Sequence, residues 1–122
     1  MARSILITGC SSGIGLDAVR VMKARGWRVI ATARKAEDLE RLKSEVGVEA
    51  VYLELADPKS IAACADAVLE MTGGKLDALF SNAAYGQPGA VEDLTPELLR
   101  HQLEVNVIGT HDLTRRFIPA MR

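Results

Sequence analysis

The apolar residues of this chain fall into short runs that alternate with stretches of helical spacing. The runs predict strands at 4–8, 28–33, 50–54 and 77–81. The stretches that follow them predict helices at 14–25, 36–46, 58–72 and 96–121. Alternation of strands and helices with short turns is typical of a parallel sheet covered on both faces. Right-handed crossovers then predict the strand order 3-2-1-4.

Local signals support the helix boundaries. Asp57-Pro58 and Thr95-Pro96 each place a capping residue before a proline, which is the arrangement of a helix N-terminus. The last predicted helix carries an apolar stripe of Leu99, Leu103, Val107, Leu113 and Phe117. Asn106 falls on this stripe, and because a buried amide without partners is costly, it is expected to bond a backbone carbonyl or a water.

Composition narrows the class of protein. The 122 residues are 48% hydrophobic and carry a net charge of −1, which predicts one small domain at 1–122 that binds neither nucleic acid nor an anionic membrane. No apolar run is long enough for a membrane span, and the start passes directly into a strand, which predicts no signal peptide. The two cysteines make no disulfide framework, so a reducing cytoplasm is expected. His101 and His111 lie off the stripe, are expected to be exposed, and belong to no metal-ligand cluster.

The chemistry of the chain centres on Thr8-Gly9-Cys10-Ser11-Ser12-Gly13-Ile14-Gly15, which lies between the first strand and the first helix. Glycines let a backbone turn tightly and approach a ligand, and the N-terminus of the next helix offers unpaired N–H groups to an anion. The spacing Gly-x-x-x-Gly-x-Gly lacks the lysine of a P-loop. It predicts a phosphate cradle, and the alternative is a plain strand-to-helix turn. Cys10 is either a spacer in this turn or a thiol whose pKa the helix lowers.

This motif resembles the nucleotide-binding signature of the short-chain dehydrogenase/reductase family. Ser81-Asn82-Ala83-Ala84 stands where that family has Asn-Asn-Ala-Gly, and Val105-Asn106-Val107-Ile108-Gly109 resembles its Asn-containing helix motif. The resemblance implies a Rossmann-type doubly wound α/β fold and an oxidoreductase that transfers a hydride between a nicotinamide cofactor and a small carbonyl or alcohol substrate. The cofactor-binding residues that it implies are Gly9, Ser11, Ser12, Gly13, Ile14, Gly15, Arg34, Glu54, Asn82 and Ala83.

The end of the second strand bears on the choice of cofactor. In dinucleotide-binding folds an acid there binds an unphosphorylated ribose, whereas an arginine suits a 2′-phosphate. Ala33 offers no acid, and Arg34 can bind a phosphate through two parallel hydrogen bonds, so NADP is favoured over NAD. Arg34 and Lys35 are otherwise a solvated basic pair. Glu54 stands where the family has an Asp that contacts adenine, and is otherwise an exposed acid at a strand end.

The resemblance also assigns roles near the fourth strand. Asn82 and Ala83 lie where the cofactor approaches closely, at the switch point of the sheet, although Asn82 can instead tie the sheet together through its side chain. Ala84 replaces the family's glycine, so a left-handed backbone there would be strained. Asn106 is implied to hold a water in the family's proton relay, with a purely structural amide as the alternative.

The sequence contains no Tyr-x-x-x-Lys, which the resemblance requires for catalysis. We therefore expect 1–122 to be the amino-terminal half of a longer single-domain enzyme, with a sheet that is incomplete at the strand-4 edge, and to be inactive alone. The open edge and the uncovered face of the last helix predict a homo-oligomer or aggregation. The alternatives are a non-catalytic dinucleotide-binding protein and a fragment without activity.

Overall fold

The computed structural model describes residues 2–122 and contains one parallel sheet of four strands. The strands are β1 (Ser4–Ile7), β2 (Arg28–Ala33), β3 (Glu49–Tyr52) and β4 (Ala78–Phe80). Their order is β3-β2-β1-β4, which confirms the predicted order 3-2-1-4 and the α/β fold class. In register, Ile5 of β1 pairs with Val29 on one side and with Ala78 on the other.

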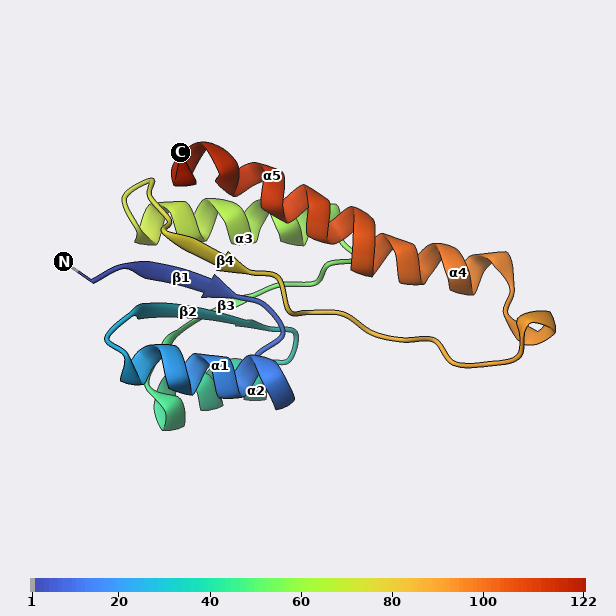
Figure 1. Ribbon diagram of the computed structural model, residues 1–122, viewed down its shortest axis with the longest axis horizontal. Helices are drawn as coiled ribbons and strands as arrows, with labels where there is room; N and C mark the ends of the chain where they lie inside the picture. The colour runs from blue at the N-terminus through green and yellow to red at the C-terminus, as the bar shows by residue number, and fades with distance from the viewer. Residues whose placement is uncertain (1) are drawn as a thin grey trace.

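Helices cover both faces of the sheet, as Figure 1 shows: α1 and α2 lie on one face, and α3 and α5 lie on the other. The helical segments are α1 (Gly13–Ala24), α2 (Ala36–Arg41), η1 (Leu42–Val46), α3 (Pro58–Met71), η2 (Val91–Asp93), α4 (Pro96–Leu103), η3 (Glu104–Gly109) and α5 (Thr110–Met121). Both predicted N-caps are present. Asp57 caps α3 by accepting a hydrogen bond from the Lys59 N–H, and Thr95 caps α4 by accepting one from the Leu98 N–H. No helix among residues 2–122 is long and apolar enough to cross a membrane.

Two cores lie on the two faces of the sheet because alternate strand residues point to opposite sides. Leu6 and Ile30 pack with α3 and with Leu113 and Phe117 of α5. The neighbouring strand residues Ile5, Ile7, Val29 and Ala31 pack on the other face with Val19 of α1 and with Leu42. Cys64 of α3 belongs to the first core and so lies between its helix and the sheet.

The last predicted helix is not one regular helix. The π-helical segment η3 separates α4 from α5, and a π turn adds one residue and rotates the helix faces on its two sides relative to each other. Leu113 and Phe117 are buried, whereas Leu99, Leu103 and Val107 are exposed, as expected for a last helix with an uncovered face. Figure 1 shows the reason, since α4 projects beyond the carboxyl end of the sheet, where the segment that follows β4 runs beside it and no strand of residues 2–122 lies beneath it.

The remaining differences concern the ends of strands. β3 ends at Tyr52, so Glu54 lies in the connection to α3 rather than at the end of the strand. β4 is shorter than predicted and pairs only with β1 among residues 2–122, which confirms the open strand-4 edge. Ala84 avoids the strained backbone, because every positive φ among the described residues belongs to a glycine.

Candidate functional site

The glycine-rich stretch forms the turn from β1 to α1, at the carboxyl edge of the sheet. Gly9 and Gly13 have φ angles of +71° and +59°, a conformation that glycine adopts without strain. A Cβ at Gly9 would lie 2.9 Å from the Cα of Ala83, whereas a Cβ at Gly13 would meet nothing within 4 Å. Gly9 therefore permits close contact with the segment after β4, and Gly13 leaves the outer surface of the turn open.

Gly15 lies in the first turn of α1 and packs against the start of the glycine-rich turn. A Cβ there would collide with the carbonyl oxygen of Gly9 and lie 2.7 Å from Nδ2 of Asn82. The Ser12 side chain does not cap α1. Since a helix leaves its first N–H groups without intrahelical partners, the start of α1 has donors to offer to an anion.

Asn82 connects the end of β4 to this turn. Its Nδ2 donates to the carbonyl oxygens of Thr8 and Gly9 at 3.1 and 3.2 Å. The Thr8 hydroxyl, which is buried, accepts from the backbone N–H groups of Asn82 and Ala83 at 3.0 and 2.9 Å. Asn82 thus ties the sheet together, as the alternative assignment of its side chain predicted, and Thr8 is a partner that sequence reasoning missed.

Cys10 is fully buried under the turn and is not an activated thiol. Its N–H donates to the Thr32 carbonyl at 2.9 Å, and its Sγ donates to the Ile7 carbonyl at 3.0 Å. Burial raises the pKa of the Cys10 thiol to about 11, because the thiolate would be poorly solvated there. The idea that the helix lowers this pKa is therefore wrong, and the spacer role stands.

Both cysteines should resist alkylation in the folded protein, because burial also raises the pKa of Cys64 to about 12. Native protein at pH 8 should react with a thiol reagent far more slowly than denatured protein. The folded state holds these protons more tightly than the unfolded state, whose thiols ionise near 9.0. The contribution of the two thiols to the free energy of unfolding should therefore be fully present below about pH 9 and be lost as the pH rises toward 11–12. Rapid labelling of either thiol in the native state would contradict this burial.

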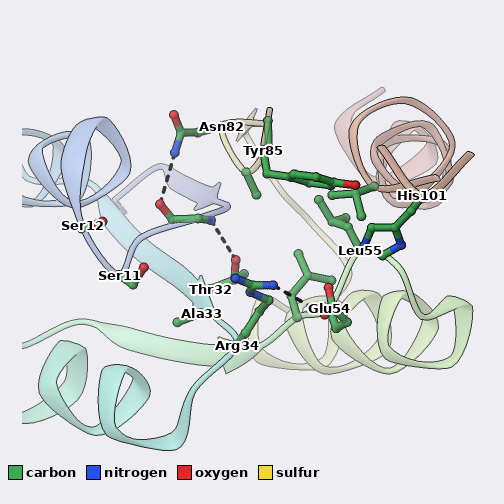
Figure 2. Close-up of a pocket in the computed structure, with 15 residues that line it drawn as sticks. Ser11, Ser12, Thr32, Ala33, Arg34, Glu54, Leu55, Asn82, Tyr85 and His101 are labelled. Atoms are coloured by element: carbon green, nitrogen blue, oxygen red, sulfur yellow. Dashed lines mark hydrogen bonds and ion pairs between the residues drawn. The ribbon is translucent and has the colours of Figure 1, made fainter. Parts of the chain in front are cut away.

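A groove of about 530 Å³ lies beside the turn. Figure 2 shows the side chains that line it, from the turn, the end of β2, the segment after β3 and the segment after β4. Seven of the residues proposed for cofactor binding line it: Gly9, Ser11, Ser12, Arg34, Glu54, Asn82 and Ala83. Gly13, Ile14 and Gly15 do not line it, and Ile14 is 72% exposed at the start of α1.

Arg34 and Glu54 lie across the groove from the turn. The Arg34 guanidinium is 3.8 Å from the Glu54 carboxylate, and the Arg34 side chain is 70% exposed. An ion pair at this distance and exposure is weak, so the guanidinium is available to an anionic ligand. Thr32 and Ala33 complete this part of the groove, so the end of β2 itself carries no acid.

Asn106 lies in η3 and is half-buried. Its Oδ1 accepts from the Tyr85 N–H at 3.0 Å, and its Nδ2 donates to the Tyr85 carbonyl at 2.6 Å. This confirms that the amide bonds a backbone carbonyl. Because the side chain is engaged at both ends, it holds the segment after β4 against the helix.

Two aromatic groups of the groove were missed by sequence reasoning. His101 and Tyr85 both line it, with ring centroids 5.5 Å apart. His101 is exposed, as predicted, but the sequence analysis did not place it at the groove. The available signal was helical spacing, since His101 lies one turn before Val105, which also lines the groove.

The sequence and the structure both resemble known proteins. The family model described as short chain dehydrogenase matches residues 3–122. An uncharacterized oxidoreductase of Escherichia coli (strain K12), YbbO, is 40% identical over 121 residues, covering 99% of this chain and 45% of that protein. This chain thus spans about half the length of the curated relatives that it matches.

Solved structures agree with this assignment. A short-chain dehydrogenase from Streptomyces avermitilis has a TM-score of 0.90 at 38% identity, covering 98% of this chain and 44% of that one. NADPH-bound carbonyl reductase from chicken fatty liver has a TM-score of 0.88 at 32% identity, covering 98% of this chain and 48% of that one. Because the family model matches nearly the whole chain and the fold agrees with that match, the chain belongs to the short-chain dehydrogenase family of oxidoreductases.

Proposed function

We propose that residues 1–122 are the dinucleotide-binding, amino-terminal half of a longer single-domain oxidoreductase that transfers a hydride between NADP(H) and a small carbonyl or alcohol substrate. One observation carries the proposal. Gly9, Ser11 and Ser12 of the turn line the groove that extends to Arg34, and α1, whose start has no side-chain cap, begins directly after Ser12. This arrangement supplies N–H donors for phosphate, an open groove and a cation, the three features that a phosphorylated dinucleotide requires.

The residues present fit the cofactor. The turn leaves Gly13 open to a ligand, and Gly13 lacks a Cβ that would project into this open space. Gly9 and Gly15 instead allow the turn to pack closely against Ala83 and α1. Gly9, Ser11, Ser12, Gly13, Ile14 and Gly15 would hold the pyrophosphate. Glu54, Asn82 and Ala83 would border the adenosine. When bound, the nicotinamide supplies the hydride-transfer chemistry.

The preference for NADP over NAD rests on Arg34. Its guanidinium is exposed, only weakly paired, and has no acid at the end of β2 beside it. The NADPH bound in the chicken carbonyl reductase structure supports the same choice.

Replacing Arg34 tests this preference. Arg34→Ala should weaken NADPH binding about ten- to a hundredfold and leave NADH binding nearly unchanged, because only NADPH carries the 2′-phosphate. Cofactor fluorescence titration of the complete protein that carries this chain measures both affinities. Arg100→Ala is the matched control, since Arg100 is 76% exposed and lies 3.7 Å from Glu97 on α4. Equal losses for the two cofactors would show that Arg34 does not bind the phosphate.

Asn106 is proposed to support a proton relay by holding the segment after β4 in place. Its amide is occupied by Tyr85, so its part in the relay would be one of positioning rather than of binding water through the side chain. Residues 1–122 contain no Tyr-x-x-x-Lys, and we propose that they have no dehydrogenase activity on their own. A non-catalytic dinucleotide-binding protein is the second candidate, since such a protein needs the turn and groove but no such pair.

An NADPH-oxidation assay of the complete protein against a panel of ketones and aldehydes separates these candidates. Turnover supports the oxidoreductase, and NADPH binding without turnover on any member supports the second candidate.

We also propose a homo-oligomer, supported by the exposed Leu99, Leu103 and Val107. A reducing, cytoplasmic location is proposed from the two buried free thiols.

A further inference from the structure

The two halves of the glycine-rich turn are held in different ways. The first half is fastened to the sheet: the Gly9 and Cys10 N–H groups donate to Thr32, and Asn82 donates to the carbonyls of Thr8 and Gly9. The second half comprises residues 11–13. Within residues 2–122, the hydrogen bond that reaches it from another part of the fold comes from Arg41.

Arg41 is the last residue of α2, and its side chain extends back to the turn. Its Nη2 donates to the Ser11 carbonyl at 2.8 Å and to Oδ1 of Asp38 at 2.9 Å. Asp38 is well covered, with 16% of its side chain exposed, while the Arg41 side chain is 43% exposed. The carboxylate one turn earlier thus holds the guanidinium in place to bind the Ser11 carbonyl.

This contact lies next to the groove. Ser11 lines the groove, and its carbonyl is bound by the guanidinium. An open turn with two positive-φ glycines has many accessible conformations, so the contact reduces the entropy that ligand binding would otherwise have to remove.

We propose that Arg41 is a positioning residue that holds the Ser11 peptide, and with it the outer half of the turn, in the conformation that receives the pyrophosphate. The effect is independent of the 2′-phosphate, because the pyrophosphate is common to NADPH and NADH. Arg41 therefore sets the affinity for both cofactors, whereas Arg34 selects between them. This inference rests on the proposed dinucleotide-binding function.

The test uses Arg41→Met, which keeps the aliphatic length of the side chain and removes its donors, in the complete protein that carries this chain. We expect NADPH and NADH to bind more weakly by the same factor, about three- to tenfold. The matched control is Arg115→Met, because Arg115 on α5 makes the same i, i+3 ion pair, at 2.7 Å to Asp112, far from the turn in sequence. Arg115→Met should change neither affinity by more than about twofold.

Three results would overturn the proposal: a loss confined to NADPH, an equal loss in the Arg115 variant, or no loss in Arg41→Met. Hydrogen exchange of the free protein gives a readout that needs no cofactor. Amides of residues 11–16 should exchange faster in Arg41→Met, with those of α3 unchanged, and unaltered exchange would reject the positioning role. If Arg41→Met does not fold, Arg41→Gln replaces it in both measurements with the same deciding outcomes. If the unaltered protein binds neither dinucleotide, the proposed function fails, while the exchange experiment still judges the Arg41 contact.

Discussion

Gly15→Ala should abolish dinucleotide binding, with a loss of more than about a hundredfold, and lower the free energy of unfolding by about 2–4 kcal/mol. Alanine is the better helix former, and helix propensity alone would predict a gain of up to about 1 kcal/mol in α1. The gain is overridden because the added Cβ meets the backbone carbonyl of Gly9 and the Asn82 amide. A backbone oxygen cannot move without distorting the whole turn.

Gly74→Ala is the control for this variant. Gly74 has a φ of +83°, but a Cβ there would meet nothing within 4 Å, so the substitution carries only the cost of a left-handed backbone, about 1 kcal/mol. Urea denaturation gives the two stabilities, and NADPH fluorescence titration gives the affinities. If Gly15→Ala bound NADPH as tightly as the unaltered protein, the packing of α1 on the turn would not shape the site.

Asn106→Ala should cost about 2–3 kcal/mol of stability, which is the second large effect that we expect. The substitution leaves both the N–H and the carbonyl of the half-buried Tyr85 without their partner. Asn106→Asp should cost nearly as much, because it keeps the acceptor for the N–H but places a second oxygen against the Tyr85 carbonyl. Thermal or urea denaturation of the complete protein provides the measurement.

Gln102→Ala provides the comparison for Asn106. Its Oε1 accepts from the Gln87 N–H at 2.8 Å, so it supports the same segment through one hydrogen bond instead of two. A loss of about 1 kcal/mol is expected for it. Equal stabilities for the Asn106 and Gln102 variants would mean that the two-point contact with Tyr85 adds nothing. The Tyr85 amide should also exchange faster with solvent in Asn106→Ala than in the unaltered protein, where the hydrogen bond to Asn106 protects it.

The hydrophobic pattern and the spacing of the glycines were sufficient to predict the features that depend on residues close together in the sequence. Ile5, Leu6 and Ile7 alternate between the two faces of the sheet because of the period of a strand, and parallel pairing follows from the helices between the strands. The position of the glycine-rich turn between β1 and α1 was also determined locally, because positive φ at Gly9 and Gly13 requires residues without a Cβ.

Only the tertiary structure decided which distant groups meet at the site. Tyr85 and Asn106 are 21 residues apart, and Arg41 and Ser11 are 30 apart. No local period encodes such pairs, because they depend on how the helices cross the sheet. The exposure of Leu99, Leu103 and Val107 is of the same kind. The sequence by itself determined an α/β fold with a turn suited to phosphate. The π turn of η3 and the projection of α4 past the sheet decided that His101 and Val105 are the helical side chains that border the groove, because packing rather than spacing sets the faces of these helices.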